Sequence, residues 1–474
     1  MGSRRRAARL VVVAATPRSV ARASEHAWIQ GGTQEARGTG GAHAPRDRYV
    51  DILRVGSLLV VVLGHWLMGG VDGEGRVTNA LVEVPWLQPL TWVLQVMPLF
   101  FLVGGVAHSY ALESLHRKGG TTRGRYAAFV RTRAGRLLRP TAAFLGVWLV
   151  LGLAARSMGL DDVPLVATAL HLVTQLLWFV GVYLGVAALA PAMHAAHRRW
   201  GATVVVALVL AAATVDVARF AGGFGALATV NFALVWLDLH QLGFCWRDGL
   251  LGRRVATTLA VGGLAGLLLI VSWGPYPVSM VGLPGEAVSN MAPPTIALLA
   301  QGIALVGAAV LLRVPVTRVL AGPRAWRAVM VAGSLAMTTF LWHLTALFVA
   351  VLTMRLAGVE QPAAGTGAWW ATRPLWLGAL VLLSLPLVLA FRRVDAPRPA
   401  PVGTLAETRR LPDLLAATGS ALTVLGVLMI SVCGVDVLGG GARRFVVADV
   451  TPGVALAVLV SGCGLLAAAR PVRR

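Results

Sequence analysis

The sequence predicts an all-α polytopic membrane protein, and its composition and its long apolar runs carry that prediction. Hydrophobic residues make up 57% of the 474 residues and charged residues only 13%, whereas soluble domains are about 25% charged. A helix needs about 20 apolar residues to cross the hydrocarbon layer of a bilayer. We identify twelve candidate spans: 51–70, 90–112, 140–159, 170–190, 202–218, 226–245, 255–274, 294–313, 328–352, 374–392, 412–432 and 450–469. The fifth is short and the eleventh contains polar residues.

The loops between the candidate spans alternate in charge, which predicts the side of the membrane on which each loop lies. Basic clusters such as "HRRW" (197–200) and "WRDGLLGRR" (246–254) follow even-numbered spans, whereas loop 273–293 has no Lys or Arg. Cytoplasmic loops of membrane proteins carry the excess of Lys and Arg. We therefore expect both termini in the cytoplasm, in a multi-pass protein of the cell membrane. Loop 433–449 has no net charge, so it does not indicate on which side of the membrane it lies.

The net charge is strongly positive, with 42 basic against 20 acidic residues. An excess of this size also occurs in proteins that bind nucleic acid, but here the arginines lie in short loops between apolar runs. We therefore expect membrane lipids among the partners, and no nucleic acid. The three cysteines, Cys245, Cys433 and Cys463, show neither metal-ligand spacing nor a disulfide framework, so we expect no metal.

Composition divides the chain into four parts. Residues 1–47 are rich in Arg, Ala and Gly and lack an apolar segment long enough for a signal peptide, so we expect a disordered cytoplasmic tail or a start codon placed too early. Residues 48–394 hold ten candidate spans. The Pro-rich linker 395–411 breaks the chain, and residues 412–474 form a C-terminal appendage of two transmembrane helices. Because no polar stripe continues into the appendage, we expect it to be dispensable for chemistry.

The first candidate span, within "RYVDILRVGSLLVVVLGHW" (48–66), carries Arg54 and His65 among apolar residues. Eleven residues at 100° each return to within about 20° of one direction, so both side chains lie on one face, about 16 Å apart along the axis. Asp51, one turn before Arg54, can pair with it. A charge inside a bilayer costs about 2.5–3.5 kcal/mol on insertion scales, which indicates a function for this polar stripe. The alternative is a packed helix with a hydrogen-bonded structural histidine.

This stripe and four further motifs resemble the integral-membrane acyltransferase family 3. The motifs, in the family's order, are "RYVDILR" with Arg54 and His65, "PLFFLVGG" (98–105), "RLLRP" (136–140), "LLWFVGVYLGVAALAP" (176–191) and "FLWHLTALF" (340–348). The resemblance runs from Arg48 to Arg393 and excludes the last two spans. "VGG" replaces the family's commoner Ser-Gly, and Thr345 stands where many members have Pro. These departures bear on substrate and not on membership.

The resemblance implies a ten-helix acyltransferase bundle in residues 48–394 that moves an acyl group, most often acetyl, from cytoplasmic acyl-CoA to a hydroxyl. The acceptor would be a glycan, a lipid-linked sugar or a secondary metabolite, so the enzyme would be an O-acyltransferase of the cell envelope. The resemblance also implies that His65 and Arg54 are catalytic. An imidazole can act as general base on the acceptor hydroxyl or carry the acyl group as acyl-histidine, and both routes stay open.

Arg136 and Arg139 are the candidate binding residues for acyl-CoA, whose phosphates need cations. Both precede Pro140, and proline is favoured at the first position of a helix. We therefore expect the third span to begin there, so that its N-terminal amides join the two guanidinium groups in holding phosphate. The alternative is that both arginines only keep their loop on the cytoplasmic side.

His343 is the candidate acceptor-binding residue. It lies about 22 Å from the start of the ninth candidate span, close to the depth of His65 in the first span. Two imidazoles at one depth predict a shared polar cavity, and the alternative is a structural histidine bonded to a neighbouring helix. His108 and His240 lie near a predicted cytoplasmic boundary and receive little weight.

Two other classes of function compete with an enzyme. Twelve spans with both termini inside is a plan that secondary transporters use, but the two halves of this chain show no similarity and the central loop 246–254 is short. A non-catalytic scaffold is the third possibility, and the Arg54–His65 stripe disfavours it. The long outer loop 273–294, rich in Gly and Pro, is a candidate lid over the acceptor or a rigid connector.

Overall fold

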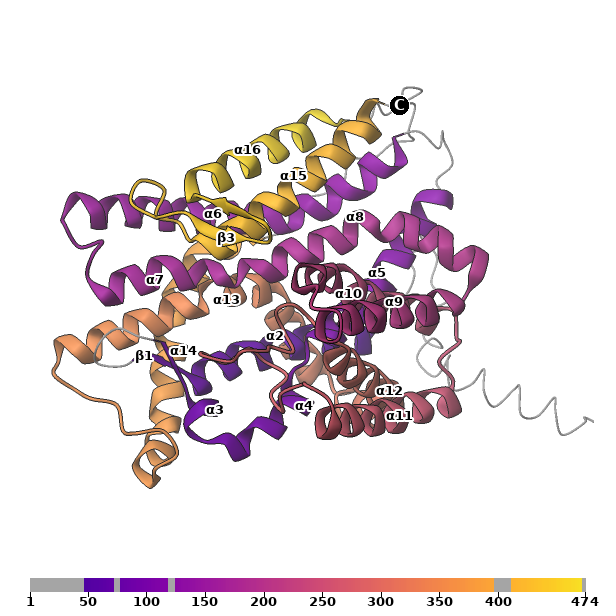
Figure 1. The fold of residues 1–474 in the computed structure, drawn as a ribbon, viewed down its shortest axis with the longest axis horizontal. Coiled ribbons are helices and arrows are strands. Elements are labelled where there is room, and N and C mark those ends of the chain that lie inside the picture. Colours follow the sequence, from indigo (N-terminus) through magenta and orange to yellow (C-terminus); the bar gives the residue numbers. More distant parts are fainter. Residues whose placement is uncertain (1–46, 72–76, 118–123, 396–410, 471–474) are drawn as a thin grey trace, which may run out of the picture. The chain divides into compact units, whose positions relative to one another are not determined.

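In the computed structural model, the described residues (47–71, 77–117, 124–395 and 411–470) are mostly helical, with very little sheet (Figure 1). The helices are α2 (Arg48–Met68), α3 (Ala80–Glu83), α4 (Thr91–Leu94), α5 (Met97–Arg117), α6 (Arg125–Ser157), α7 (Pro164–Gln175), α8 (Leu177–Trp200), α9 (Thr203–Phe220), α10 (Asn231–Arg247), α11 (Arg253–Trp273), α12 (Ile296–Val319), α13 (Pro323–Leu356), α14 (Gly367–Asp395), α15 (Leu411–Cys433) and α16 (Pro452–Ala468). The remaining elements are the 3-10 turns η1 (Pro85–Leu90) and η2 (Gly225–Val230) and the antiparallel pairs β1 (Gly69–Val71) with β2 (Val77–Asn79) and β3 (Arg443–Phe445) with β4 (Ala448–Val450). The predicted tail (1–47) and linker (395–411) fall almost wholly outside the described residues.

The predicted all-α membrane fold is confirmed. Within the described ranges, ten helical segments are long and apolar enough to cross a membrane. All twelve predicted spans coincide with helices, including the fifth and the eleventh, which form α9 and α15. Two of the predicted spans form shorter helices, α10 and α16, which have 17 residues each. At 1.5 Å per residue, each is about 26 Å long. α10 is short because the first part of the predicted span forms the 3-10 turn η2.

The third span is longer than predicted. α6 begins at Arg125 instead of Pro140 and runs for 33 residues, with Pro140 in its interior. The expectation was wrong because the basic stretch before Pro140 itself has helical apolar spacing, and Ala127, Val130 and Ala134 are buried along it. The length of α6 is about 50 Å, whereas the hydrocarbon layer of a bilayer is about 30 Å thick. A helix of this length must tilt or must carry its basic first half beyond the apolar layer.

Glycines let α5 and α10 touch through their backbones. A β-carbon on Gly105 would lie 2.0 Å from the carbonyl oxygen of His240, and one on Gly243 would lie 2.2 Å from the carbonyl oxygen of Leu102. Close approach at small residues is a common mode of association between membrane helices. The contact also brings the polar side chains of the two helices near each other.

We expect Gly105→Ala to lower the thermal unfolding midpoint of the detergent-purified protein, because overpacking a tight contact costs about 1–3 kcal/mol. Gly146→Ala in α6 is the matched control, since no atom lies within 4 Å of its β-carbon position. Alanine also favours the helix more than glycine does, so the control should unfold at the same or a higher temperature. Equal midpoints for Gly105→Ala and the wild type would contradict the backbone contact.

The loop between α11 and α12, residues 274–295, is held by side-chain hydrogen bonds. Its internal bonds run from Asn290 Nδ2 to the carbonyl oxygens of Pro277 (2.7 Å) and Ser279 (2.9 Å), and from Thr295 Oγ1 to Asn290 Oδ1 (2.7 Å). Tyr276 donates its hydroxyl to Asp216 of α9 at 3.1 Å, and burial followed by the charge of this carboxylate raises the pKa of the tyrosine. These bonds favour a rigid connector over a lid.

Candidate active site

α2 and α13 bring His65 and His343 together. The Nδ1 atom of His65 lies 2.8 Å from the Nε2 atom of His343, and the ring planes differ by 6°. The Nδ1 atom of His343 lies 2.6 Å from the carbonyl oxygen of Phe340, one turn earlier in α13. The indole of Trp66 donates to the carbonyl oxygen of His343 (3.0 Å), and the indole of Trp376 in α14 donates to that of Trp66 (2.8 Å). Three helices therefore hold the pair in place.

The hydrogen bonds define where the protons of this pair lie. A carbonyl oxygen only accepts hydrogen bonds, so His343 Nδ1 carries a proton and donates it to Phe340. The Nε2 atom of a neutral His343 is then an acceptor, and His65 must donate to it through Nδ1–H. The Nε2 atom of a neutral His65 keeps a free lone pair. The bond at one ring nitrogen thus determines the chemistry available at the other.

The two histidines differ in exposure. His343 is 0% exposed and both of its ring nitrogens are bonded, whereas His65 is exposed. The free Nε2 atom of His65 can therefore meet a substrate. His343 has no ring nitrogen left for an acceptor molecule, which suits a residue that orients His65. The acceptor-binding role that its depth predicted stays a prediction.

Arg54 lies away from the histidine pair. Its guanidinium donates to Asp51 across one turn of α2 at 3.1 Å, so the predicted ion pair is confirmed. The Arg54 side chain is 41% exposed. About 16 Å of helix separates it from His65, which is farther than an arginine side chain reaches. Arg54 shares α2 with His65 but lies about three turns from the histidine pair, and its catalytic role stays a prediction.

A comparison with known protein families identifies the family of the chain. A family model for an acyltransferase domain matches residues 47–393. The chain belongs to acyltransferase family 3. The resemblance predicted from the motifs is thereby confirmed, and membrane acyl transfer replaces the transporter and scaffold alternatives. No curated protein and no solved structure matches the chain.

In this acyltransferase, α6 carries Arg136 and Arg139 one turn apart, and both side chains are exposed. Among the residues that the structure describes, no carboxylate pairs with either guanidinium group. Both are therefore available to an anion. The expected help from helix N-terminal amides is wrong, because α6 begins several turns earlier and the amides of Gly124 and Ala127 donate to Asp413 instead.

The acyltransferase has a second histidine pair between α5 and α10, formed by two residues to which the sequence gave little weight. His108 Nδ1 lies 2.9 Å from His240 Nε2, and both residues are buried. The other ring nitrogen of each, and both carboxylate oxygens of buried Asp238, have no hydrogen-bond partner within the described part of the chain. A signal was present: Gly105 and Gly243 each stand three residues from one of these histidines, and their backbone contact sets the two rings opposite each other.

In the described ranges of the acyltransferase, no group of three or more His, Cys, Asp or Glu residues is arranged to hold a metal ion. Cys245, Cys433 and Cys463 are free thiols. The thiol of Cys433 donates to the carbonyl oxygen of Val450 at 3.2 Å, which ties the end of α15 to β4. That contact is structural.

Proposed function

We propose that this protein is an O-acyltransferase of the cell membrane that moves an acyl group, most often acetyl, from acyl-CoA to a hydroxyl of a glycan, a lipid-linked sugar or a small metabolite. One observation carries the proposal: His65 is an exposed residue whose Nδ1 is bonded to the buried His343, while its Nε2 has no hydrogen-bond partner in the described part of the chain. A hydroxyl needs a base to attack a thioester, and histidine suits that task near neutral pH.

The same Nε2 atom serves two chemical routes. In the direct route, it takes the proton of the acceptor hydroxyl while the hydroxyl oxygen attacks the thioester carbonyl carbon. The tetrahedral intermediate then expels CoA as a thiolate, which takes the proton back from His65. In the acyl-enzyme route, Nε2 attacks the carbonyl carbon itself and the CoA thiolate leaves. The acceptor hydroxyl then displaces the imidazole, and its proton passes to the thiolate.

His343 assists both routes in the same way. In each, His65 gains positive charge as the bond to the carbonyl carbon or to the acceptor proton forms. The hydrogen bond from His65 Nδ1–H to His343 Nε2 strengthens as that charge develops. The bond from His343 to Phe340 keeps the acceptor atom of His343 pointed at His65. His343 thereby orients His65, as the carboxylate orients the histidine of a Ser-His-Asp triad.

CoA carries its thioester at the end of a long flexible arm, so its phosphates and its thioester bind at different depths. Arg136 and Arg139 supply the phosphate-binding cations at the end of the bundle that we expect to face the cytoplasm. We assign Arg54 to this donor side, because it lies about 16 Å from His65 along α2. His65 lies near the opposite end of α2, within reach of an acceptor from the outer face.

We expect Arg136→Gln and Arg139→Gln each to raise the dissociation constant for CoA roughly ten- to a hundredfold, because a hydrogen bond to a charged group contributes about 1.5–3 kcal/mol. Isothermal titration of CoA into the protein in nanodiscs measures the change. Arg199→Gln is the matched control, since it removes an exposed arginine from the last turn of α8. Equal affinity in all three variants and the wild type would leave Arg136 and Arg139 as topology signals only.

A thioester assay tests the function itself. The purified protein in nanodiscs is mixed with acetyl-CoA and with candidate acceptors, and free CoA is followed with a thiol reagent. We expect acceptor-dependent release of CoA, together with an acylated product that is missing from metabolite profiles of a strain lacking the gene. An acylated product that depends on the gene in the cell, without release of CoA by the purified protein, would identify a different donor. Absence of both CoA binding and CoA release would overturn the proposal.

A further inference from the structure

The C-terminal hairpin α15–α16 lies outside the residues that match the family, yet it packs against the family bundle. α15 contacts α6, α7 and α8, and Figure 1 shows the hairpin running alongside α6 and α8. Leu428 of α15 fits against Gly181 of α8, where a β-carbon would lie 2.8 Å from the leucine side chain. The hairpin is therefore seated on the bundle by close packing.

Asp413, in the first turn of α15, caps the first turn of α6. Its Oδ2 accepts from the amide of Gly124 (2.8 Å) and its Oδ1 accepts from the amide of Ala127 (2.9 Å). The first amides of a helix have no partner within the helix, and a side chain at the N-cap position usually satisfies one of them. The N-cap residue of α6 is Gly124, which has no side chain. Asp413 supplies the missing oxygens, and its negative charge suits the positive end of the helix dipole.

Arg131, two turns into α6, makes the reciprocal contact. Its guanidinium donates to the carbonyl oxygens of Leu466 and Ala467 in the last turn of α16. The last carbonyl groups of a helix also lack partners within the helix, and a cation is favourable there. The two helices of the hairpin are thus tied to the same stretch of α6 by one acidic and one basic side chain.

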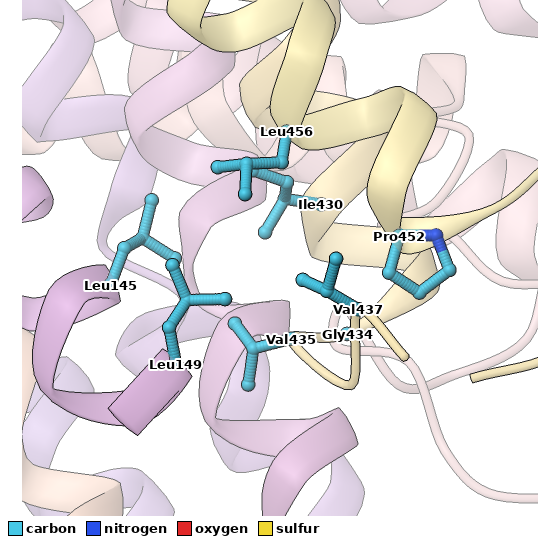
Figure 2. A pocket seen from close by; sticks show the side chains of 8 residues that line it. All are labelled: Leu145, Leu149, Ile430, Gly434, Val435, Val437, Pro452 and Leu456. Atoms are coloured by element: carbon cyan, nitrogen blue, oxygen red, sulfur yellow. The ribbon is translucent and has the colours of Figure 1, made fainter. Parts of the chain in front are cut away.

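Apolar contacts continue this attachment at both ends of α6. Near its start, Ala127, Val130 and Ala134 belong to a separate buried cluster that includes Ala416 of α15 and Leu466 of α16. Near the other end, an apolar pocket is lined by residues of α6, α15, α16 and the segment between the hairpin helices: Leu145, Leu149, Ile430, Gly434, Val435, Val437, Pro452 and Leu456 (Figure 2). The hairpin therefore contacts α6 over most of its length.

We propose that Asp413 is a positioning residue for the acyl donor, and that the hairpin holds the basic half of α6 in the place where Arg136 and Arg139 meet CoA. This inference rests on the proposed donor role of those two arginines. They follow Ala127 by nine and twelve residues of continuous helix, so loosening the first turns of α6 changes where both guanidinium groups lie. If so, the appendage belongs to the donor site, whereas the sequence predicted that it is dispensable for chemistry.

Two substitutions of Asp413 and one control test the proposal in the full-length protein. Asp413→Ala removes both acceptor oxygens and Asp413→Asn keeps one, whereas Asp449→Asn changes an exposed carboxylate on the same hairpin, paired with Arg444. Each variant is characterised by titration of CoA, by kcat and KM for acetyl-CoA, and by hydrogen exchange of the amides of residues 124–128. All are measured in nanodiscs.

We expect Asp413→Ala to raise the dissociation constant for CoA about fivefold, the equivalent of a lost helix cap, and to raise KM for acetyl-CoA in parallel. The amides of residues 124–128 should exchange faster, whereas kcat should stay within about twofold of the wild type because the histidine pair is untouched. The dissociation constant of Asp413→Asn for CoA should lie between those of Asp413→Ala and the wild type. Faster exchange with unchanged CoA affinity would reduce Asp413 to a structural cap. Unchanged exchange would refute the contact, and a wild type that binds no CoA would refute the proposed function instead.

Discussion

His65→Ala is expected to lower the rate of acyl transfer by about 10²–10⁴-fold, the range that loss of a general base produces. The substitution deletes the one ring nitrogen of the histidine pair that is free to take a proton or to attack a thioester. It also removes a polar group from a membrane helix, so membrane insertion should not suffer. The measurement is the initial rate at saturating acetyl-CoA and acceptor, normalised to monodisperse protein in nanodiscs.

Two further variants separate chemistry from packing at His65. His65→Asn retains a donor that can reach His343 but lacks a basic ring nitrogen, so it should be as inactive as His65→Ala. His171→Ala in α7 removes a partly buried histidine outside both histidine pairs and should keep the wild-type rate within about twofold. A folded His65→Asn variant that transfers acyl groups at the wild-type rate would remove His65 from the reaction.

Helix rise was enough to predict from the sequence that the two histidines lie at similar depth. His65 and His343 stand 17 and 20 residues from the starts of α2 and α13, so both lie at similar depth if the two helices begin on one side. Depth does not reveal rotation about the helix axis or which helices are neighbours. The bond between the rings, and the bond that commits His343 Nδ1 to Phe340, depend on both and emerge only from the packed structure.

The parts that the sequence did not predict depend on contacts between segments that lie far apart in the chain. Pro140 looked like the first residue of a span, because a basic stretch precedes it, but burial against the hairpin keeps that stretch helical from Arg125 onward. The cap from Asp413 crosses 286 residues to reach Ala127. No local pattern in the sequence records such a bond, so the hairpin looked like a detachable appendage.

His343→Ala is expected to lower kcat by about 10²-fold, because a small misplacement of a catalytic group costs about that much. Without His343, the Nδ1–H group of His65 loses its acceptor, so the ring can rotate and both neutral tautomers become populated. His343→Gln places an amide oxygen in a similar position, and partial recovery of kcat is expected. Thr353→Val, at an exposed position of α13, is the control and should be near wild type.

Hydrolysis of acetyl-CoA by water distinguishes the orienting role of His343 from the acceptor-binding role that its depth first predicted. An orienting residue acts on every reaction of His65, so transfer and hydrolysis should fall by the same factor in His343→Ala, with KM for the acceptor unchanged. A residue that binds the acceptor acts on transfer only. Loss of transfer with full hydrolysis and a raised acceptor KM would therefore restore the earlier assignment.

The double variant His65→Ala/His343→Ala completes this test, because residues that act as a unit have strongly non-additive effects. Once the imidazole of His65 is gone, His343 has nothing to orient, and its removal should change the residual rate by less than about twofold. A further loss of about 10²-fold would mean that His343 contributes to transfer on its own. Because Nε2 of His343 is bonded to His65 in the intact pair, such a contribution would require a rearranged site in which the two rings separate.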